Sequence, residues 1–139
     1  LLIKDKEGNV PAMRNFHIQE GERFSKLNKV IAKSLDNLKK AIKGEAVMSD
    51  DIDRMYNSML NNKVPMMWSF HAYPSLKPLS SWVDNLQLRI EFIRSWLLIG
   101  KPISYWLPSL FFPQGCLTAL LQSYARKYTI AIDQLNFGF

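Results

Sequence analysis

The sequence predicts a mainly α-helical protein, a bundle of about four helices with a β-strand segment at its C-terminal end. Apolar residues recur every three or four positions over several long stretches, and residues that start or stop helices bound these stretches. Near the C-terminus the apolar residues alternate instead, which is typical of a strand. With 47% hydrophobic and 22% charged residues, the 139-residue chain has the composition of a folded domain, or of part of a larger one, rather than of a disordered segment.

The first predicted helix follows an irregular leader. Residues 1–15 show no periodicity and contain Gly8 and Pro11, so the leader is predicted to lack regular structure. From Gln19 to Lys43 the pattern predicts a helix of about six turns. Its apolar face is expected to carry Phe24, Leu27, Ile31, Ser34, Leu38 and Ala41. Gly44 follows at once, and a left-handed glycine is a common way to end a helix.

A second helix is predicted to begin after Ser49. The serine hydroxyl can accept a hydrogen bond from a free amide of the first turn. The carboxylates at 50, 51 and 53 suit the positive end of the helix dipole, so we interpret them as helix-start residues rather than as a metal site. Its apolar face is expected to carry Ile52, Met55, Tyr56, Met59 and Leu60. Asn61, Asn62 and the residue before Pro65 should end it.

A third helix is predicted to begin near Pro78, because proline favours the first helical turn. It should bury Leu79, Trp82, Val83, Leu86, Ile90, Ile93, Trp96 and Leu97 along one face. Arg89, with the charged residues at 91 and 94, is expected to lie mostly off this face. Gly100 and Pro102 should end the helix.

Residues 102–125 contain no charged side chain, and this length would suffice for a membrane span of ~20 residues. Pro102, Pro108 and Pro113 interrupt the stretch, so it is predicted to be a loop (102–112) followed by a helix from Pro113 to Tyr128 rather than a span. The loop carries six large apolar or aromatic residues, namely Tyr105, Trp106, Leu107, Leu110, Phe111 and Phe112. Such side chains should pack against other protein.

The last residues predict a strand. Ile130 and Ile132 alternate with small or polar residues, and Phe137 and Phe139 do the same. Since no second strand is predicted in this chain, the strand's partners should belong to a larger fold.

The sequence carries no evident catalytic, metal or cofactor motif. Its glycines form no phosphate-binding pattern, and its histidines and carboxylates show no metal-ligand spacing. The single cysteine, Cys116, excludes an internal disulfide and lies among apolar residues, as a core cysteine does. A nucleophile pair of Cys116 and His71 remains an alternative, which predicts that alkylation of the thiol abolishes an activity.

The net charge of +6 comes partly from lysines on one predicted helix. They are Lys26, Lys29, Lys33, Lys39, Lys40 and Lys43. We interpret them as a solvated helix face rather than a nucleic-acid site, because no aromatic residues alternate with them in a binding loop. The N-terminal residues lack the apolar stretch of a secretory signal, so the protein is expected to be cytoplasmic, with neither nucleic acid nor membrane as partner.

A series of short motifs follows in a characteristic order. They are KAIKG (40–44), VP (64–65), YPSLKPL (73–79), GKP (100–102), YWL (105–107), FFPQG (111–115), ARKY (125–128) and IDQLNF (132–137), with Trp68, Trp82, Arg89 and Trp96 between them. In this order and spacing the sequence resembles the C-terminal region of dynein heavy chains, most closely the axonemal ones, from about Gln19 to Phe139.

The resemblance implies a segment that follows the sixth AAA+ module of a microtubule motor. In that family the segment begins with helices and continues into a β-barrel, and it carries neither the ATP site nor the microtubule site. Residues 16–128 would then be the helical part and residues 129–139 the start of the strand part. The implied role is non-catalytic: to support the AAA+ ring and modulate the motor, without a cofactor, in the cytoskeleton of the ciliary or flagellar axoneme.

In this hypothesis the functional residues are those that pack the segment together and against the rest of the heavy chain, including its barrel. The predicted packing anchors are Trp68, Tyr73, Pro74, Trp82, Trp96, Trp106, Phe112 and Pro113. An alternative is a free-standing helical interaction module that binds a partner helix through the aromatic loop.

Overall fold

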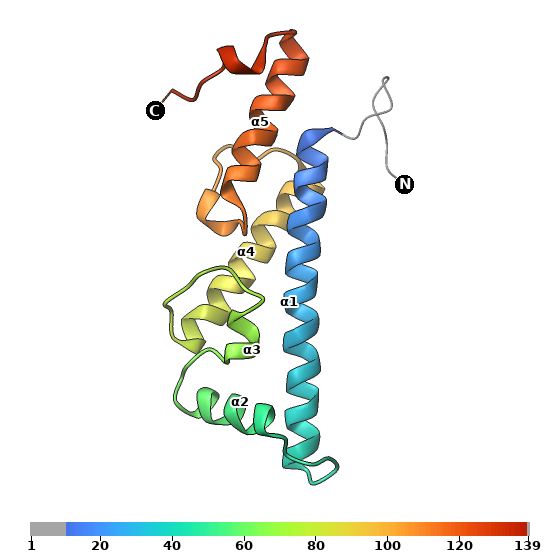
Figure 1. Cartoon of the computed structure of the whole chain (residues 1–139), viewed down its shortest axis with the longest axis vertical. Coiled ribbons are helices and arrows are strands. Elements are labelled where there is room, and N and C mark those ends of the chain that lie inside the picture. The colour runs from blue at the N-terminus through green and yellow to red at the C-terminus, as the bar shows by residue number, and fades with distance from the viewer. Residues whose placement is uncertain (1–10, 139) are drawn as a thin grey trace.

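The computed structural model describes residues 11–138, which form five α-helices and two short 3₁₀ helices. The α-helices are α1 (Ala12–Ile42), α2 (Asp50–Leu60), α3 (Met66–Ser69), α4 (Leu79–Ile99) and α5 (Pro113–Tyr128). The 3₁₀ helices are η1 (Leu107–Ser109) and η2 (Ile132–Gln134). Helix α1 forms the spine, and it contacts the other four α-helices, which lie along one side of it (Figure 1). The prediction of a mainly helical fold is confirmed.

Helix α1 is longer than its periodicity indicated. It begins at Ala12, directly after Pro11, whereas the apolar pattern predicted a start at Gln19. The predicted irregular leader therefore does not extend to residue 15, and residues 1–10 of it lie outside the described part. The C-terminal end agrees with the prediction, because Gly44 adopts a left-handed φ of 75°. The amides of Gly44 and Glu45 donate to the carbonyls of Ala41 and Lys40, which satisfies the last turn.

Helix α2 begins as its sequence predicted. The Ser49 hydroxyl accepts a hydrogen bond from the amide of Ile52 at 3.4 Å, and the acidic residues occupy the first turn. Helix α3 was not predicted. It is a single turn that follows Pro65, and it places Trp68 against α1.

Helices α4 and α5 also start at the predicted prolines. Pro78 is the N-cap of α4, and Pro113 is the first residue of α5. Gly100 ends α4 with a φ of 116°, a conformation open to glycine and costly for other residues. The predicted loop 102–112 lies between these helices and contains η1 as its one helical turn among the described residues.

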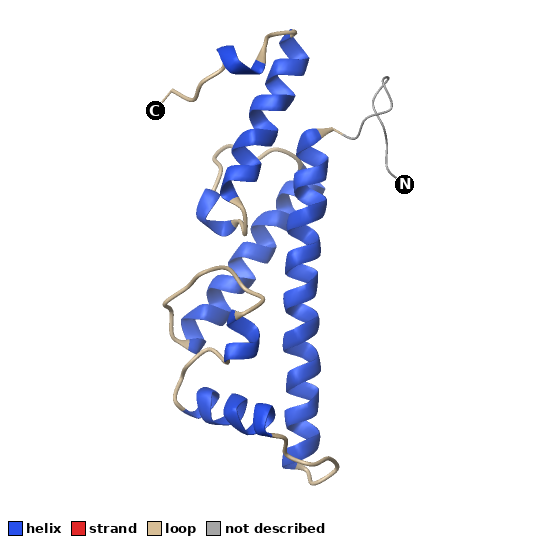
Figure 2. Cartoon of the chain, viewed as in Figure 1, coloured by secondary structure: helices blue, strands red, loops and turns tan. Residues whose placement is uncertain are grey.

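The predicted terminal strand is wrong for the described residues. Thr129 ends α5 in the left-handed conformation, and the amide of Ile130 turns back to the carbonyl of Ala125. Residues 132–134 then form η2, and no strand occurs anywhere in residues 11–138 (Figure 2). The physical reason is that a strand needs a neighbour for its amide and carbonyl groups, and this part of the protein supplies none.

Within the described residues, no helix combines the length and the apolar character that crossing a membrane requires. The uncharged stretch is divided as predicted, with η1 and its flanking turns separating α4 from α5.

Candidate functional site

The best-defined site in the structure is the packing centre around Trp82. The Trp82 ring stacks on Trp68 from α3 and on Tyr73 from the following loop, with centroid distances of 6.0 and 6.2 Å. Trp68 also donates from its indole nitrogen to the hydroxyl of Ser34 on α1, at 2.9 Å. The polar end of the buried indole is thereby satisfied, as buried tryptophan generally requires. Helices α1, α3 and α4 and the loop that follows α3 are thus joined at Trp82.

The predicted packing anchors occupy different environments. Trp68, Tyr73, Trp82 and Trp96 are buried, Trp106 and Pro113 are half-buried, and Pro74 and Phe112 are exposed. Trp96 contacts Tyr105 edge to face at 5.1 Å. Exposed Phe112 still has a local role, because its ring fills the space in which a side chain at Gly115 would stand. Their importance as anchors stays a prediction.

A buried carboxylate holds the end of the aromatic loop. Glu20 on α1 is 1% exposed, and its two carboxylate oxygens accept hydrogen bonds from the amides of Phe111 and Phe112 at 2.8 and 2.9 Å. These amides come just before the first turn of α5, where amides lack partners within the helix. Glu20 therefore joins α1 to the start of α5.

A buried guanidinium holds the middle of the same loop. Arg89 on α4 lies over the Tyr73 ring, with its central carbon 3.6 Å from the ring centroid. It donates to the carbonyl of Pro108 and, at 2.7 Å, to the side-chain oxygen of Asn85. The planar group thus combines a cation–π contact with two hydrogen bonds. We call Glu20 and Arg89, with the loop 102–112 that they hold, the loop clamp.

The clamp was missed at the level of sequence, although its signal was present. Glu20 lies four residues after Phe16 and four before Phe24, so it belongs to the apolar face of α1. Arg89 was expected mostly off the buried face of α4, and this was wrong: it is buried between Leu86 and Ile93. A charged residue at a core position of a periodic pattern is the feature that identifies both.

Burial governs the ionisation of the groups near the clamp. It raises the pKa of the Tyr73 hydroxyl, an effect that the positive charge of Arg89 opposes. It lowers the pKa of Arg89. Burial, followed by the negative charge of Glu20, raises the pKa of the Cys116 thiol to about 11. Cys116 is therefore held as a neutral thiol near pH 7, the opposite of the thiolate that nucleophilic catalysis needs.

The structure gives no support to the Cys116–His71 alternative. Cys116 is fully buried on α5, whereas His71 lies beside the ring of Phe70, 5.2 Å away, on the groove between α2 and α3. No hydrogen bond between the two side chains is found in residues 11–138. The same residues contain no group of three or more histidine, cysteine or carboxylate side chains placed to hold a metal ion.

The fold and the clamp define a helical packing module, in which the buried polar groups position the module's own loop. Sequence comparison gives the family. A profile of the C-terminal domain of dynein heavy chains matches residues 3–139, so the protein belongs to this family.

Individual relatives are axonemal. The chain is 50% identical over its whole length to human dynein axonemal heavy chain 6. It is 46% identical over 92% of its length to human dynein axonemal heavy chain 1, and 47% identical over 87% to human dynein axonemal heavy chain 3. In each case it spans only 3% of the length of the relative.

Proposed function

We propose that this protein is a non-catalytic structural and regulatory segment of an axonemal dynein heavy chain. It packs on the AAA+ ring, needs no cofactor of its own, and supports ATP-driven movement along microtubules by the whole motor in the axoneme. The observation that carries the proposal is the 50% identity to an axonemal heavy chain over all 139 residues. The buried clamp supports it, because the groups that ordinarily serve catalysis are used here to hold a loop.

An apolar surface at the end of α4 supports packing against further protein. Leu98, Ile99 and Ile103 are strongly exposed, with Ile99 at 86% and Ile103 fully accessible. Soluble proteins seldom leave neighbouring large apolar side chains in water unless they form an interface. We infer that this surface, which we call the α4-end patch, is covered by the remainder of the heavy chain.

The experiment replaces the matching segment of human dynein axonemal heavy chain 6 with this sequence. We expect the exchanged motor to keep its microtubule-stimulated ATPase rate and gliding velocity, and a motor that lacks the segment to lose part of both. If the deletion changes neither quantity in a folded motor, the proposal fails.

Two pairs of substitutions distinguish docking of the α4-end patch on the heavy chain from folding of the segment itself. Ile99→Ser with Ile103→Ser alters the α4-end patch, while Ile130→Ser with Ile132→Ser makes the same chemical change beyond α5, at residues that are exposed to a smaller degree. We expect the first pair to reproduce the loss seen on deletion, with helix content unchanged, and the second pair to have a smaller effect. Equal effects of the two pairs would remove the patch from the proposal.

The alternative of a free-standing module that binds through its aromatic loop has less support. Phe111 contacts Phe24 and Tyr73, and Trp106 contacts Phe92, so these rings are already in contact within the protein. A partner helix would have to displace them.

A further inference from the structure

One side of α1 borders a continuous hollow that the packing centre does not fill. Three adjoining depressions share Val30 as a lining residue. The largest, of 700 Å³, lies between α1, α2 and α3. The other two extend it along α1, and one of them also shares Met67 with it. We call this continuous surface the Val30 groove.

The floor of the Val30 groove is rich in methionine. Met55, Met66 and Met67 line it together with Pro65 and Phe70. Met66 and Phe70 are 83% and 82% exposed, although both are large and apolar. Methionine side chains adapt their shape to a ligand, and methionine-rich grooves are a recurrent docking surface for amphipathic helices. The floor therefore suits the apolar face of a helix.

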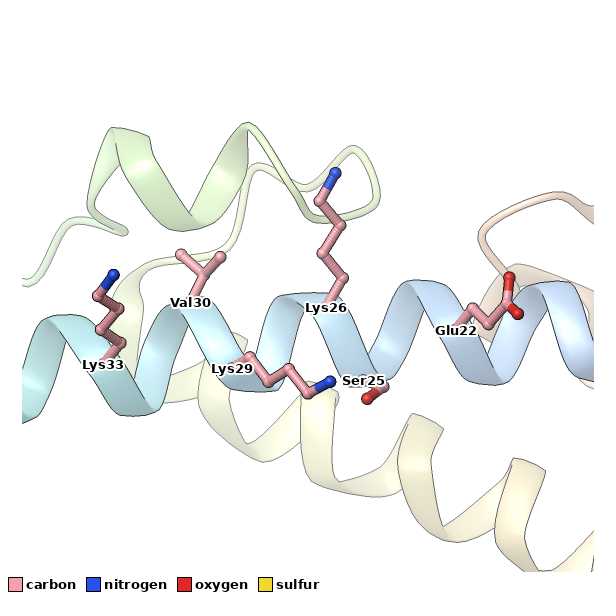
Figure 3. Close-up of a pocket in the computed structure, with 6 residues that line it drawn as sticks. All are labelled: Glu22, Ser25, Lys26, Lys29, Val30 and Lys33. Carbon is pink, nitrogen blue, oxygen red and sulfur yellow. The ribbon is translucent and has the colours of Figure 1, made fainter.

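The edges of the Val30 groove carry an excess of positive charge. Lys26, Lys29, Lys33 and Arg54 line it, against Glu22 and Asp51. Figure 3 shows Lys26, Val30 and Lys33 projecting to the same side of α1, with the valine between the two lysines. Among the described residues the one ion pair found joins Asp36 and Lys40, so these lysines have no carboxylate partner within salt-bridge distance. Their spacing of three and four residues matches successive turns of a helix.

We propose that the Val30 groove binds an acidic amphipathic helix of a separate protein. Its apolar residues contact Met66, Met67 and Phe70, and its carboxylates pair with Lys26, Lys29 and Lys33. Charge complementarity selects an acidic partner over a basic one and speeds association. The inference does not depend on the proposed function, because it concerns a different face of the molecule.

The charged edges favour a separate protein over a buried segment of the same heavy chain. Permanent interfaces resemble a domain core and contain few charged residues at their centre. The α4-end patch has this apolar character, whereas the Val30 groove combines an apolar floor with four cationic side chains. The latter composition is typical of a partner that binds and dissociates.

The first test is direct binding to the 139-residue protein. The probe is a fluorescent synthetic helix of about 18 residues, since isolated helices shorter than ~12–15 residues are marginal. Leucines form its apolar face and glutamates its polar face. In the matched probe lysines replace the glutamates. We expect the acidic probe to bind at least about tenfold more tightly at low salt, and the difference to shrink near 1 M salt, where the Debye length is ~3 Å.

The second test reverses the charge of two lysines of the Val30 groove. Lys26→Glu with Lys33→Glu should weaken the acidic probe by about tenfold and make the basic probe the better ligand. Lys77→Glu with Lys101→Glu makes the same change in net charge on exposed loop residues, and should leave the preference unchanged. Phe70→Ser should weaken both probes, including at high salt, because it removes apolar contact area.

Two results would overturn the proposal. If the acidic and basic probes bind equally, the groove is not a site for acidic helices. The same holds if Lys26→Glu with Lys33→Glu does not make the basic probe the better ligand. If the acidic probe binds the 139-residue protein but not the exchanged heavy chain, a segment of the heavy chain already occupies the groove and the partner is not separate. Both readouts are binding constants, so they are independent of the ATPase and gliding measurements that test the proposed function.

Discussion

Both halves of α1 are amphipathic and carry buried residues, yet they are covered to different degrees. The N-terminal half places Glu20 beneath the loop 102–112 and α5, whereas near the middle of the helix Val30 lies beside an open groove, with lysines before and after it. The apolar faces of the two halves are alike in sequence. The difference lies in the kind of buried polar partner: Glu20 accepts from two backbone amides of the loop, whereas Ser34 accepts from one side chain, that of Trp68. An apolar face alone does not determine whether a surface is closed.

Trp82 contacts residues that support both the loop clamp and the Val30 groove. It stacks on Tyr73, which lies under Arg89 of the loop clamp, and on Trp68, which helps to hold the α3 side of the Val30 groove. Loss of this residue should therefore disturb both regions, whereas changes within one region should leave the other in place.

The largest effect is expected for Trp82→Ala. Replacing a fully buried tryptophan with alanine removes its contacts and leaves a cavity, which typically costs about 3–5 kcal/mol. Urea denaturation followed by circular dichroism should show this loss in the free energy of unfolding, with Leu88→Ala on the exposed side of α4 as the control. A loss below about 1 kcal/mol would mean that the two regions are not joined at Trp82.

The next effect is expected for Glu20→Ala, which acts on the loop clamp only. The amides of Phe111 and Phe112 lose their acceptor, and because these hydrogen bonds are only partly buried we expect a total loss of about 1–3 kcal/mol. Glu22→Ala removes an exposed carboxylate from the same helix and serves as the matched control. Hydrogen exchange should speed up at residues 111 and 112 in the first variant. Unchanged exchange there would show that the clamp does not hold the loop.

Much of the helical fold could be predicted because its signals are local. Ser49, Gly44, Pro78 and Pro113 mark helix ends through their own backbone preferences or hydrogen bonds, and all four lie at or beside the ends observed. The four-residue helix α3 was missed since one turn carries too little periodicity to detect. The terminal strand was wrong since alternation describes a side-chain pattern, while a strand also needs a neighbour.

The clamp could not be predicted in detail because its partners are distant in sequence. Glu20 bonds amides more than ninety positions away, and Arg89 bonds a carbonyl nineteen positions away. Their position on the apolar faces indicates burial. It does not indicate which backbone groups they meet, because that depends on how the loop between α4 and α5 turns.

A third prediction concerns Cys116, a fully buried residue of α5. Because its pKa is raised to about 11 from an ordinary 9.0, the thiolate fraction near neutral pH falls about a hundredfold, and burial slows access further. Alkylation in the native protein should therefore be at least about a hundredfold slower than in urea. Fast alkylation of the native protein would show that α5 separates readily from α1.

The same shift makes stability depend on pH. The neutral thiol is favoured in the folded state, so its contribution is complete below pH 9.0 and is lost as the pH rises toward about 11. The free energy of unfolding should fall over this range less steeply in Cys116→Ala than in the parent protein. Burial, followed by the charge of Cys116, raises the pKa of Tyr105, so the difference between the two curves reports the thiol together with its effect on Tyr105.

The smallest effect on stability is expected for Phe70→Ser, which alters the floor of the Val30 groove. The ring is mostly exposed and contacts the ring of neighbouring His71, so the free energy of unfolding should change by no more than about 0.5 kcal/mol. Thermal and urea denaturation can measure this against Phe111→Ser, whose ring packs on Phe24 and Tyr73 and should cost several times more. If Phe70→Ser destabilises the protein as strongly as Phe111→Ser, the phenylalanine belongs to the core and the Val30 groove is not a free surface. If it leaves stability intact and weakens the helical probes, two surfaces of α1 differ in function as well as in packing: the surface under the loop 102–112 stabilises the fold, and the surface along the Val30 groove is available to a partner.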